Sequence, residues 1–407
     1  MRLFLALIFF TLLHLGCTSN DDSSTKVSDF LGNKCVSSKD SYELQETRNL
    51  GISVPRNCFP EYDHVQLYKD SLLFVKKRKS SQIDVFDILR KQYSFSFKID
   101  DNFFSNMGNF HVHNLDSIFI CNENMGIIMV DKNGKIIDKY KVSIPAVSNN
   151  QQFAGSIFFE NYGKAINSFD GRRLHLTVAS ADFWEFEHEG NLKVHGTFDI
   201  KNKKWDTVFG AFPNLYSLSQ KEPIELPYWA TQPYCLVKGD TSIISFPSEH
   251  NVYVYNNRTG KLLFSKCIGS KYIKSLLPPF KHGLSDMQVQ RNYLIEAPYY
   301  GETSYHSRIK MYSRVVLQQQ NLSIGNGKVN RPENKKLSII FFDKNMDIVG
   351  EYLTQPNDTF SSVGEYGRMG AIPTSDGFLA KSKIELMPSD DILFYNTVLK
   401  IVPKKTQ

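Results

Sequence analysis

Three short segments of this 407-residue chain carry residue types that could do chemistry. In His111-Val112-His113 the imidazoles are two residues apart, so a strand would place both on one face, as in the beginning of a metal site. No carboxylate or third histidine stands at a fixed spacing from them. Two hydrogen-bonded or solvent-facing histidines are the simpler interpretation, and the sequence predicts neither a metal nor any other cofactor.

The segment Asp343–Asp347 has oxygen ligands at alternate positions, as a calcium loop begins. Ile348 stands where such a loop needs glycine, and Thr354 stands where it needs a bidentate glutamate. The same residues suit a hairpin turn, like those that follow Asp131. We therefore predict a turn here and no calcium site.

The acidic and aromatic segment 183–189 could hold two carboxylates for glycoside chemistry. Alternation instead puts Glu185, Glu187 and Glu189 on one face and the aromatic and histidine side chains on the other, which is typical of a strand with one wet face. The sequence also lacks the GxSxG, HExxH and phosphate-loop motifs. No catalytic residue is predicted.

Aromatic residues make up 13% of the chain, and two clusters fall where strand patterning fails, at 212–234 and 298–308. Long connections in compact folds tend to be functional or disordered, and aromatic content argues against disorder. Rings beside Arg and Glu can stack on sugars or anchor a protein partner, whereas the simpler alternative is that they pack over the ends of the core. The predicted binding residues are Tyr228, Trp229, Tyr299, Tyr300, Tyr305, His306, Arg308 and Arg314.

The elements that must position these residues are short runs rich in Val, Ile, Phe and Tyr, separated by Asn, Asp and Gly, as in all-β proteins. One sequence pattern recurs six times. It consists of a β-run after a polar turn, a second β-run that ends near Asp or Asn, a turn, and a third β-run. The pair Asn133-Gly134 between two runs is a strong hairpin signal because both turn positions need positive φ. The six units begin at Asp70, Asp116, Asp170, Asp240, Tyr293 and Asp376.

Six units across residues 60–403 average roughly 57 residues, against about 40–50 for a propeller blade before insertions. Closing such units into a ring removes exposed sheet edges. The segment Tyr42–Thr47 could supply the outer strand of the last blade. We predict an all-β chain in which residues 41–407 form one β-propeller with six blades; a seven-bladed ring or a decorated β-sandwich is the alternative.

The N-terminus has the pattern of an export signal. After Arg2, the thirteen mostly apolar residues Leu3–Leu15 would span roughly 20 Å as a helix, too little for a bilayer core of about 30 Å. They lead into Gly16-Cys17, which resembles the bacterial lipobox. We predict a signal peptide at 1–16 and lipidation of Cys17; the alternative is an ordinary secretory signal with a chance cysteine.

Residues 17–40 are predicted to form a flexible tether, because the segment 18–26 is polar and lacks apolar periodicity. Its Ser and Asp tract resembles the surface-export signal of Bacteroidetes lipoproteins, although a solvated linker would look similar. We expect a cell-envelope protein at the outer membrane. The net charge of +6 and the absence of a long basic block argue against nucleic-acid binding. The densest basic cluster, Lys76–Lys79, is interpreted as a solvated hairpin tip.

Five cysteines remain when Cys17 is set aside, so at least one thiol is free if the others pair internally. Cys35 and Cys58 are the predicted pair because both lie near the N-terminus. Cys121 and Cys267 fall inside β-runs and are predicted to be buried thiols.

The stretches Ile339–Glu351 and Thr374–Leu379 resemble domain of unknown function 4221, a family of Bacteroidetes lipoproteins with propeller-like folds. The stretch Tyr305–Arg314 lies where that family also carries Tyr and Arg. The resemblance implies a location and a fold but no activity.

The function expected from these observations is non-catalytic: a lipid-tethered propeller that presents loops to a glycan, a peptide or an envelope protein. One alternative is a hydrolase acting on glycosides or lactones in the central funnel. Another is a structural partner in a larger envelope assembly.

Overall fold

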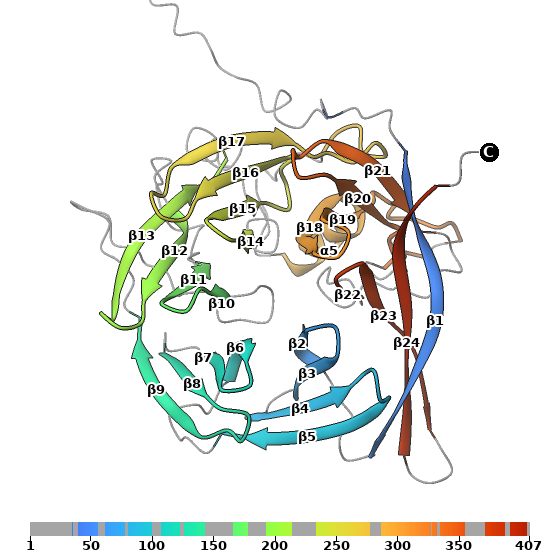
Figure 1. Ribbon diagram of the computed structural model, residues 1–407. Helices are drawn as coiled ribbons and strands as arrows, with labels where there is room; N and C mark the ends of the chain where they lie inside the picture. Colours follow the sequence, from blue (N-terminus) through green and yellow to red (C-terminus); the bar gives the residue numbers. More distant parts are fainter. Residues whose placement is uncertain are drawn as a thin grey trace, which may run out of the picture.

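The chain forms a closed ring of six four-stranded antiparallel blades around a central axis (Figure 1). The prediction of an all-β, six-bladed propeller is confirmed. The computed structural model describes residues 35, 40–55, 62–77, 80–99, 107–122, 126–142, 166–177, 193–213, 233–276, 286–326, 328–331, 334–354, 371–386 and 391–404.

The blades follow one another along the chain, each running from its innermost to its outermost strand. Blade I contains β2 (Tyr62–Tyr68), β3 (Leu72–Lys77), β4 (Gln82–Asp87) and β5 (Gln92–Lys98); blade II contains β6 (Met107–Asn114), β7 (Ser117–Asn122), β8 (Gly126–Val130) and β9 (Ile136–Lys141); blade III contains β10 (Ile166–Phe169), β11 (Arg173–Thr177), β12 (Lys193–Asp199) and β13 (Lys204–Ala211). Blade IV contains β14 (Tyr234–Lys238), β15 (Thr241–Ser245), β16 (Asn251–Asn256) and β17 (Leu262–Cys267); blade V contains β18 (Tyr299–His306), β19 (Met311–Leu317), β20 (Leu337–Phe342) and β21 (Ile348–Leu353); blade VI contains β22 (Ala371–Pro373), β23 (Gly377–Leu386), β24 (Asp391–Pro403) and β1 (Tyr42–Pro55).

Hydrophobic pattern follows the position of each strand within its blade. The middle strands are sandwiched between neighbouring blades, so β20 reads as an almost continuous apolar run and buries all six of its residues. The outermost strands have one wet face, and β5 and β9 alternate between exposed and covered positions. These two patterns are the ones that made the units recognisable in the sequence.

Each blade has one strand more than the recurring pattern predicted. The innermost strands are short or rich in polar residues and glycine, as in β10 and β18, because they face the channel as well as the core. The predicted first β-run of the fifth unit was wrong, since Tyr293–Ile295 belong to helix α5 (Met287–Glu296). The N-cap residue of this helix, Asp286, accepts hydrogen bonds from the backbone N–H groups of Gln288 and Val289. The prediction of a loop at 298–308 was also wrong: strand β18 lies there.

The turn between the third and fourth strands of blades I to V carries an Asp or Asn that holds it. In blade V, Asp343 Oδ1 accepts from the backbone N–H groups of Asn345 at 2.8 Å and Asp347 at 3.0 Å. Asp131 makes the same bonds in blade II, which confirms the predicted hairpin. The expectation of positive φ at both turn positions was wrong, because only Gly134 and not Asn133 has a positive φ. The equivalent residues are Asp87, Asp199 and Asn256.

The two ends of the chain close the ring. Strand β1 pairs antiparallel with β24, with Tyr42 opposite Pro403 and Pro55 opposite Asp391, and so forms the outermost strand of blade VI, as predicted. Its far end also touches blade I, where Ser53 pairs with Gln92. Hydrogen bonds between chain ends therefore leave no gap between the last and the first blade.

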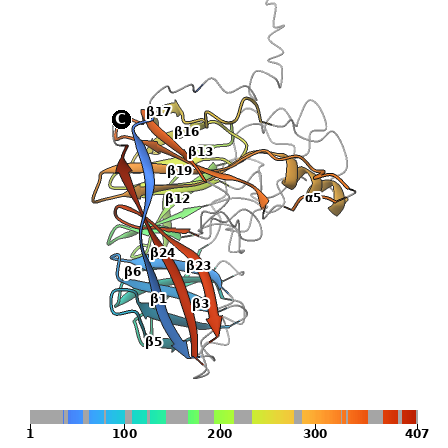
Figure 2. The same cartoon turned by 90° about the vertical axis from the view of Figure 1, so that its right-hand side faces the viewer.

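The two faces of the disc differ in their connections. The turns between first and second strands and between third and fourth strands are short and lie on one face, whereas the connection that contains α5 stands off the other face (Figure 2).

No helix in the described ranges is long and apolar enough to cross a bilayer. In the predicted solvated hairpin tip, Lys76 is instead buried, while residues 78 and 79 lie outside the described residues.

Candidate functional site

A cavity of about 320 Å³ lies where the inner strands of four blades converge on the axis. Blade I contributes the turn after β2, blade IV contributes β14, blade V contributes β18 and its following turn, and blade VI contributes the end of β22 and its turn. We call this cavity the channel pocket. Its lining residues are Lys69, Asp70, Leu236, Glu302, Thr303, Ser304, Tyr305, Ser307, Pro373, Thr374 and Ser375.

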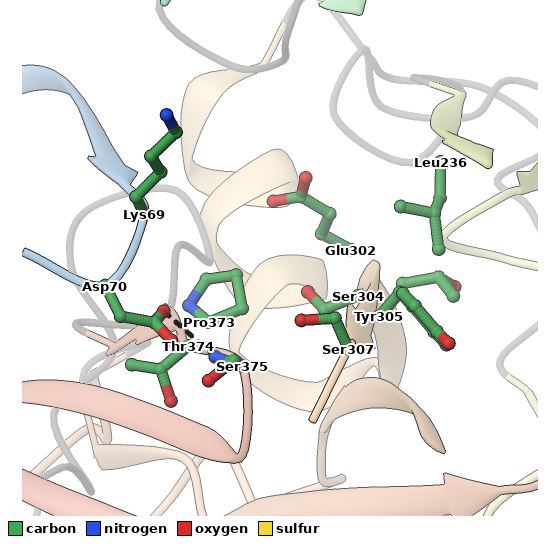
Figure 3. Close-up of a pocket in the computed structure, with 11 residues that line it drawn as sticks. Lys69, Asp70, Leu236, Glu302, Ser304, Tyr305, Ser307, Pro373, Thr374 and Ser375 are labelled. Atoms are coloured by element: carbon green, nitrogen blue, oxygen red, sulfur yellow. Dashed lines mark hydrogen bonds between the residues drawn. The ribbon is translucent and has the colours of Figure 1, made fainter. Parts of the chain in front are cut away.

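The lining of the channel pocket combines an ammonium group, carboxylates and hydroxyls with one aromatic ring. Figure 3 shows Lys69 and Asp70 on one side, Leu236 and Tyr305 on the other, and Glu302 between them. A cation, carboxylates and hydroxyls converging on a concave space are what a small polar ligand needs for orientation. No histidine or cysteine lines this cavity among the described residues.

One wall of the channel pocket is held by contacts between three blades. The backbone N–H of Ser375 in blade VI donates to Asp70 Oδ1 in blade I at 3.0 Å. The Ser375 carbonyl accepts from the backbone N–H of Arg308 in blade V at 2.8 Å, and the Arg308 guanidinium pairs with Asp376 at 2.8 Å. Asp70 is thus already engaged in joining the blades, and Glu302 is the second carboxylate among the lining residues.

The opposite wall is organised by Lys238 of β14. Its Nζ donates to the Tyr312 hydroxyl at 3.0 Å and lies 3.6 Å from the centre of the Tyr305 ring, a cation–π contact. Burial works against the charged form of Lys238, but hydrogen bonds to Tyr312 and Tyr305 outweigh it and raise its pKa. The ammonium therefore stays charged and fixes the Tyr305 ring beside the cavity.

The structure separates the predicted binding residues into two groups. Four of them are buried in the interior: Tyr299, Tyr300, His306 and Arg314. For the rings of Tyr299 and Tyr300, burial agrees with the alternative interpretation that these rings pack against the core. Tyr305 lines the channel pocket, and Arg308 is exposed beside it in the ion pair with Asp376. Tyr228 and Trp229 lie outside the described residues, as does the segment 183–189.

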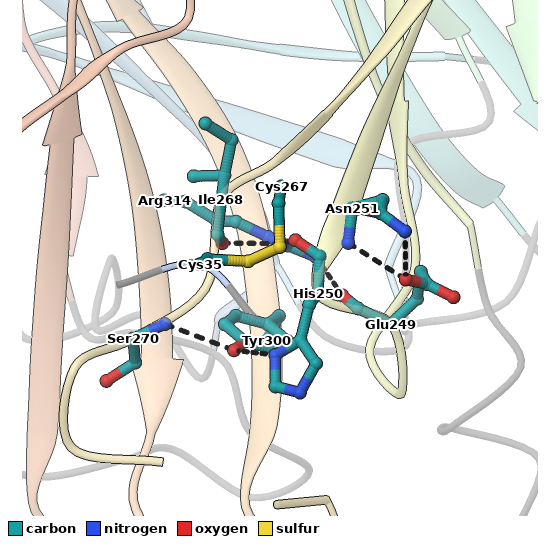
Figure 4. Close-up of a disulfide and its surroundings, with 9 residues drawn as sticks. All are labelled: Cys35, Glu249, His250, Asn251, Cys267, Ile268, Ser270, Tyr300 and Arg314. Atoms are coloured by element: carbon teal, nitrogen blue, oxygen red, sulfur yellow. Dashed lines mark hydrogen bonds between the residues drawn. A yellow bond between two sulfur atoms is a disulfide. The ribbon is translucent and has the colours of Figure 1, made fainter. Parts of the chain in front are cut away.

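Arg314 of β19 holds the connection between β15 and β16. Its guanidinium donates to the carbonyl oxygens of His250, Ile268, Phe246 and Glu249 at 2.8–3.0 Å and lies 3.9 Å from the centre of the Tyr300 ring. Figure 4 shows this cation beside Tyr300, whose hydroxyl is 2.6 Å from His250 Nδ1. A buried cation that is bound to backbone carbonyls is a structural group.

His306 is likewise held inside, between β19 and blade VI. Nδ1 lies 2.9 Å from the carbonyl oxygen of Thr374, so it carries the proton, and Nε2 lies 2.8 Å from the Ser313 hydroxyl and accepts from it. Burial lowers the pKa of His306 to about 4, although the Thr374 carbonyl and the nearby Asp376 and Asp70 act in the opposite direction. The imidazole is therefore neutral at pH 7.

A serine and a histidine also meet between blades III and IV. His195 Nε2 lies 3.3 Å from Ser242 Oγ and 3.8 Å from Cys235 Sγ. All three residues are buried, and the Ser242 hydroxyl donates to Asn257 Oδ1 at 2.5 Å, away from the imidazole. Burial raises the pKa of Cys235 to about 12. The group has the residue types of a nucleophile and a base but offers neither access nor the right proton arrangement.

Cys35 is bonded to Cys267 at the end of β17, so the predicted pairing with Cys58 and the predicted buried thiol at Cys267 were both wrong (Figure 4). The two partners are 232 residues apart in the sequence and meet because the N-terminal segment passes the rim of blade IV. Cys121 is a buried thiol, as predicted, and burial raises its pKa to about 12. Cys58 lies outside the described residues.

The histidine pair of β6 does not gather further ligands. The His113 ring packs edge-on against Phe169, with ring centres 5.0 Å apart. In the described parts of the chain, no three His, Cys, Asp or Glu side chains are placed to hold a metal ion.

A second hollow lies at the turns of blades III and IV, and it is lined by three arginines and two aspartates. Each arginine already has a carboxylate partner: Arg172 pairs with Asp199, Arg173 with Asp170 and Arg258 with Asp240. The arginines therefore neutralise the turn aspartates of the propeller.

The fold and the site define the class of this protein: a six-bladed β-propeller, closed by its own N-terminal strand, with a polar pocket on its axis. The chain belongs to the family described as domain of unknown function DUF4221, whose model matches residues 41–353.

One solved structure shows the same ring. The crystal structure of a DUF4221 member from Bacteroides vulgatus superposes with a TM-score of 0.64 at 14% identity, over 89% of this chain and 100% of that one. Weaker matches are the β-propeller domain of Cps50 (Swd1) from Myceliophteria thermophila (TM-score 0.39, 8% identity) and BamB from Moraxella catarrhalis (TM-score 0.37, 9% identity), each covering 87% of this chain and 100% of its own. No curated protein matches the sequence.

The sequence analysis named only Tyr305 among the lining residues, although its aromatic cluster at 298–308 also contains Glu302, Thr303, Ser304 and Ser307. A signal was present, since Asp70 opens the first repeat and Thr374 and Ser375 precede the turn of the last one. In a propeller the turns after the innermost strands all surround the axis. Aligning the six units by these turns would have identified the channel pocket, whereas Leu236 carries no such signal.

Proposed function

We propose that this protein is a cell-envelope lipoprotein, anchored to the outer membrane by lipid on Cys17, that binds a polar ligand in the channel pocket without transforming it. The ligand class is a sugar unit of a glycan or a short peptide segment. The observation that carries the proposal is the convergence of Lys69, Glu302 and Tyr305 on one cavity at the axis.

The size and chemistry of the channel pocket support a small polar ligand. Its volume of about 320 Å³ is at the lower end of ligand sites, enough for one or two sugar rings or a dipeptide. A tyrosine ring offers a stacking face, and hydroxyls and a carboxylate offer the hydrogen bonds that orient hydroxyl or amide groups.

Binding is favoured over hydrolysis by the state of the lining. Asp70, one of the two carboxylates, accepts a backbone hydrogen bond that joins blades I and VI. Ser304 and Ser307 share the channel pocket with no histidine among the described lining residues, so the imidazole base of a serine–histidine pair is not beside them.

The test is a panel of mono- and disaccharides and di- and tripeptides, screened by the shift that each causes in thermal unfolding, with Kd then measured by calorimetry. Glu302→Gln and Tyr305→Ala should each weaken binding about tenfold or more, because each removes a contact that a buried ligand cannot replace. Glu46→Gln on the exposed part of β1 is the control and should leave Kd unchanged.

Turnover of a ligand from the panel would overturn the non-catalytic proposal, and binding that is insensitive to Glu302 and Tyr305 would place the site elsewhere. The anchor is tested separately. The mass of the mature N-terminal peptide should show diacylglycerol on Cys17, and Cys17→Ser should release the protein from membranes.

A further inference from the structure

Exposed apolar side chains are concentrated at the rim of blade IV. Eight large hydrophobic residues are exposed among those the structure describes, and four of them fall within residues 262–272. Leu262, Leu263 and Phe264 are consecutive in β17, with 50%, 51% and 44% of their surface exposed, and Tyr272 follows at 43%. Strand β17 is the last strand of its sheet, so its side chains cover nothing further out.

The same segment is basic. Residues 258–274 contain five Lys or Arg side chains and no acidic one, and all five are exposed. Three of these cations reach neighbouring carboxylates: Arg258 lies 3.7 Å from Asp240, Lys266 2.9 Å from Asp347, and Lys271 3.3 Å from Asp40. Such exposed pairs are weak and yield readily to a competing anionic surface. Apolar side chains flanked by Lys and Arg are typical of segments that rest at a membrane interface.

The disulfide ties the N-terminal chain to this same place. Cys267 is the last residue of β17, and its bond to Cys35 makes the rim of blade IV the point where the tether leaves the ring. Seventeen residues separate Cys35 from Cys17. A polar chain of that length spans roughly 25 Å on average, so a lipid on Cys17 would hold the membrane close to β17.

We propose that the rim of blade IV around β17 docks on the surface of the membrane that holds the lipid anchor. Leu262, Leu263 and Phe264 enter the interface, and the flanking lysines contact anionic headgroups. The disc then stands on its edge, with β17 at the membrane and both faces turned sideways, so the channel pocket stays open to ligands. The orientation rests on the lipid anchor proposed above, whereas the lipid affinity of the rim does not.

Strand pairing with a second copy of the chain is the competing use of such an edge. Lys261 directly precedes β17, and Lys266 lies within it. Lysines on an edge strand oppose the addition of another strand, because pairing would bring them against a neighbouring backbone and its side chains. The same lysines favour an anionic lipid surface.

The experiment uses the mature chain produced from residue 18 onward, so that neither the apolar segment Leu3–Leu15 nor a lipid on Cys17 contributes, and measures cosedimentation with two kinds of vesicle. We expect binding to vesicles of phosphatidylcholine with a quarter phosphatidylglycerol, and weaker binding to phosphatidylcholine alone. Leu263→Asp with Phe264→Asp should lower the partition coefficient at least tenfold. Lys261→Glu with Lys274→Glu should lower it on the anionic vesicles alone.

The matched control is Leu89→Asp with Ile137→Asp. These side chains are 63% and 50% exposed but belong to blades I and II, and their loss should leave vesicle binding unchanged. Equal vesicle binding by the rim variant (Leu263→Asp with Phe264→Asp) and the control variant would overturn the proposal, and so would the absence of vesicle binding by the unsubstituted rim. A dimer in light scattering that dissociates in the rim variant would also overturn it. None of these outcomes depends on whether Cys17 is acylated in cells or on the ligand of the channel pocket.

Discussion

At the scale of single residues, two of the side chains that the sequence predicts to bind a ligand instead maintain the ring. Arg314 binds four backbone carbonyls, and His306 bridges Ser313 and the carbonyl of Thr374. A buried cation or imidazole in an interior of low dielectric must have partners, and backbone carbonyls at the ends of blades supply them. The residues that we propose to contact a ligand are the less conspicuous Lys69, Glu302 and Tyr305.

His306 should make stability depend on pH. Its folded-state pKa of about 4 lies below the value of about 6.5 in the unfolded chain, so between these values the unfolded state binds the proton and the native state does not. Stability from this group is complete above pH 6.5 and falls as the pH is lowered toward 4. Burial also lowers the pKa values of His175 and His195, so they contribute in the same direction. Urea unfolding should therefore show a loss of stability between pH 7 and pH 4.5 that is smaller by on the order of 2 kcal/mol in His306→Gln than in the wild type.

His113→Gln, at an exposed position of β6, is the control for the loss of an imidazole. If wild type and His306→Gln show the same pH profile, the buried imidazole is already protonated in the folded protein.

At the scale of elements, the turns determine how closely blades approach one another. Gly134 closes the turn after β8 with φ of +79°, and a Cβ at this position would lie 2.6 Å from the carbonyl oxygen of Lys98 in blade I. Gly171 has a φ of +93°, but a Cβ there would meet nothing within 4 Å. Both positions require glycine for a positive φ, and only position 134 also lacks the space for a Cβ atom.

Replacing each glycine by alanine separates these two requirements. Gly171→Ala should cost about 1 kcal/mol, because only the positive φ is penalised. Gly134→Ala should cost at least about 1 kcal/mol more, because the carbonyl of Lys98 must also shift. Urea unfolding of the two variants measures the difference, and equal costs would mean that blades I and II separate freely at this turn.

At the scale of the whole molecule, the N-terminal part of the chain makes two long-range links to the ring. The β1–β24 pairing closes it by hydrogen bonds, and the Cys35–Cys267 bond links the N-terminal segment to blade IV, across a separation of 232 residues. A crosslink over such a long stretch restricts the unfolded chain strongly, and the chain-entropy model gives about 5 kcal/mol as its upper value. The hydrogen-bonded closure does not depend on it.

Reduction should therefore lower stability without opening the ring. Dithiothreitol should decrease the free energy of unfolding by about 2–5 kcal/mol and leave the far-ultraviolet circular dichroism unchanged below the transition. The variant Cys267→Ser should start at the lower stability and show no further response to the reductant. An unfolding midpoint that is the same with and without reductant would show that the bond adds nothing to stability.

The sequence by itself determined the blades. Alternating and continuous apolar runs report on how a strand is buried, and the turn residues Asp131, Gly134 and Asp343 report on hairpins, because both signals arise from neighbours within a few residues. Six repeats of these local signals specified the propeller, and the segment at Tyr42 could be matched to the missing outer strand. The innermost strands escaped detection because polar residues that face the channel blur the alternation.

Only the tertiary structure decided the partner of Cys35, the burial of Arg314 and the walls of the channel pocket. Asp70 and Ser375 touch across 305 residues of sequence, and Cys35 and Cys267 across 232. Such contacts exist because a closed ring brings its first, middle and last blades to one axis and one rim. The closeness of residues that are hundreds of positions apart is a property of the closed ring, and no local stretch of sequence encodes it.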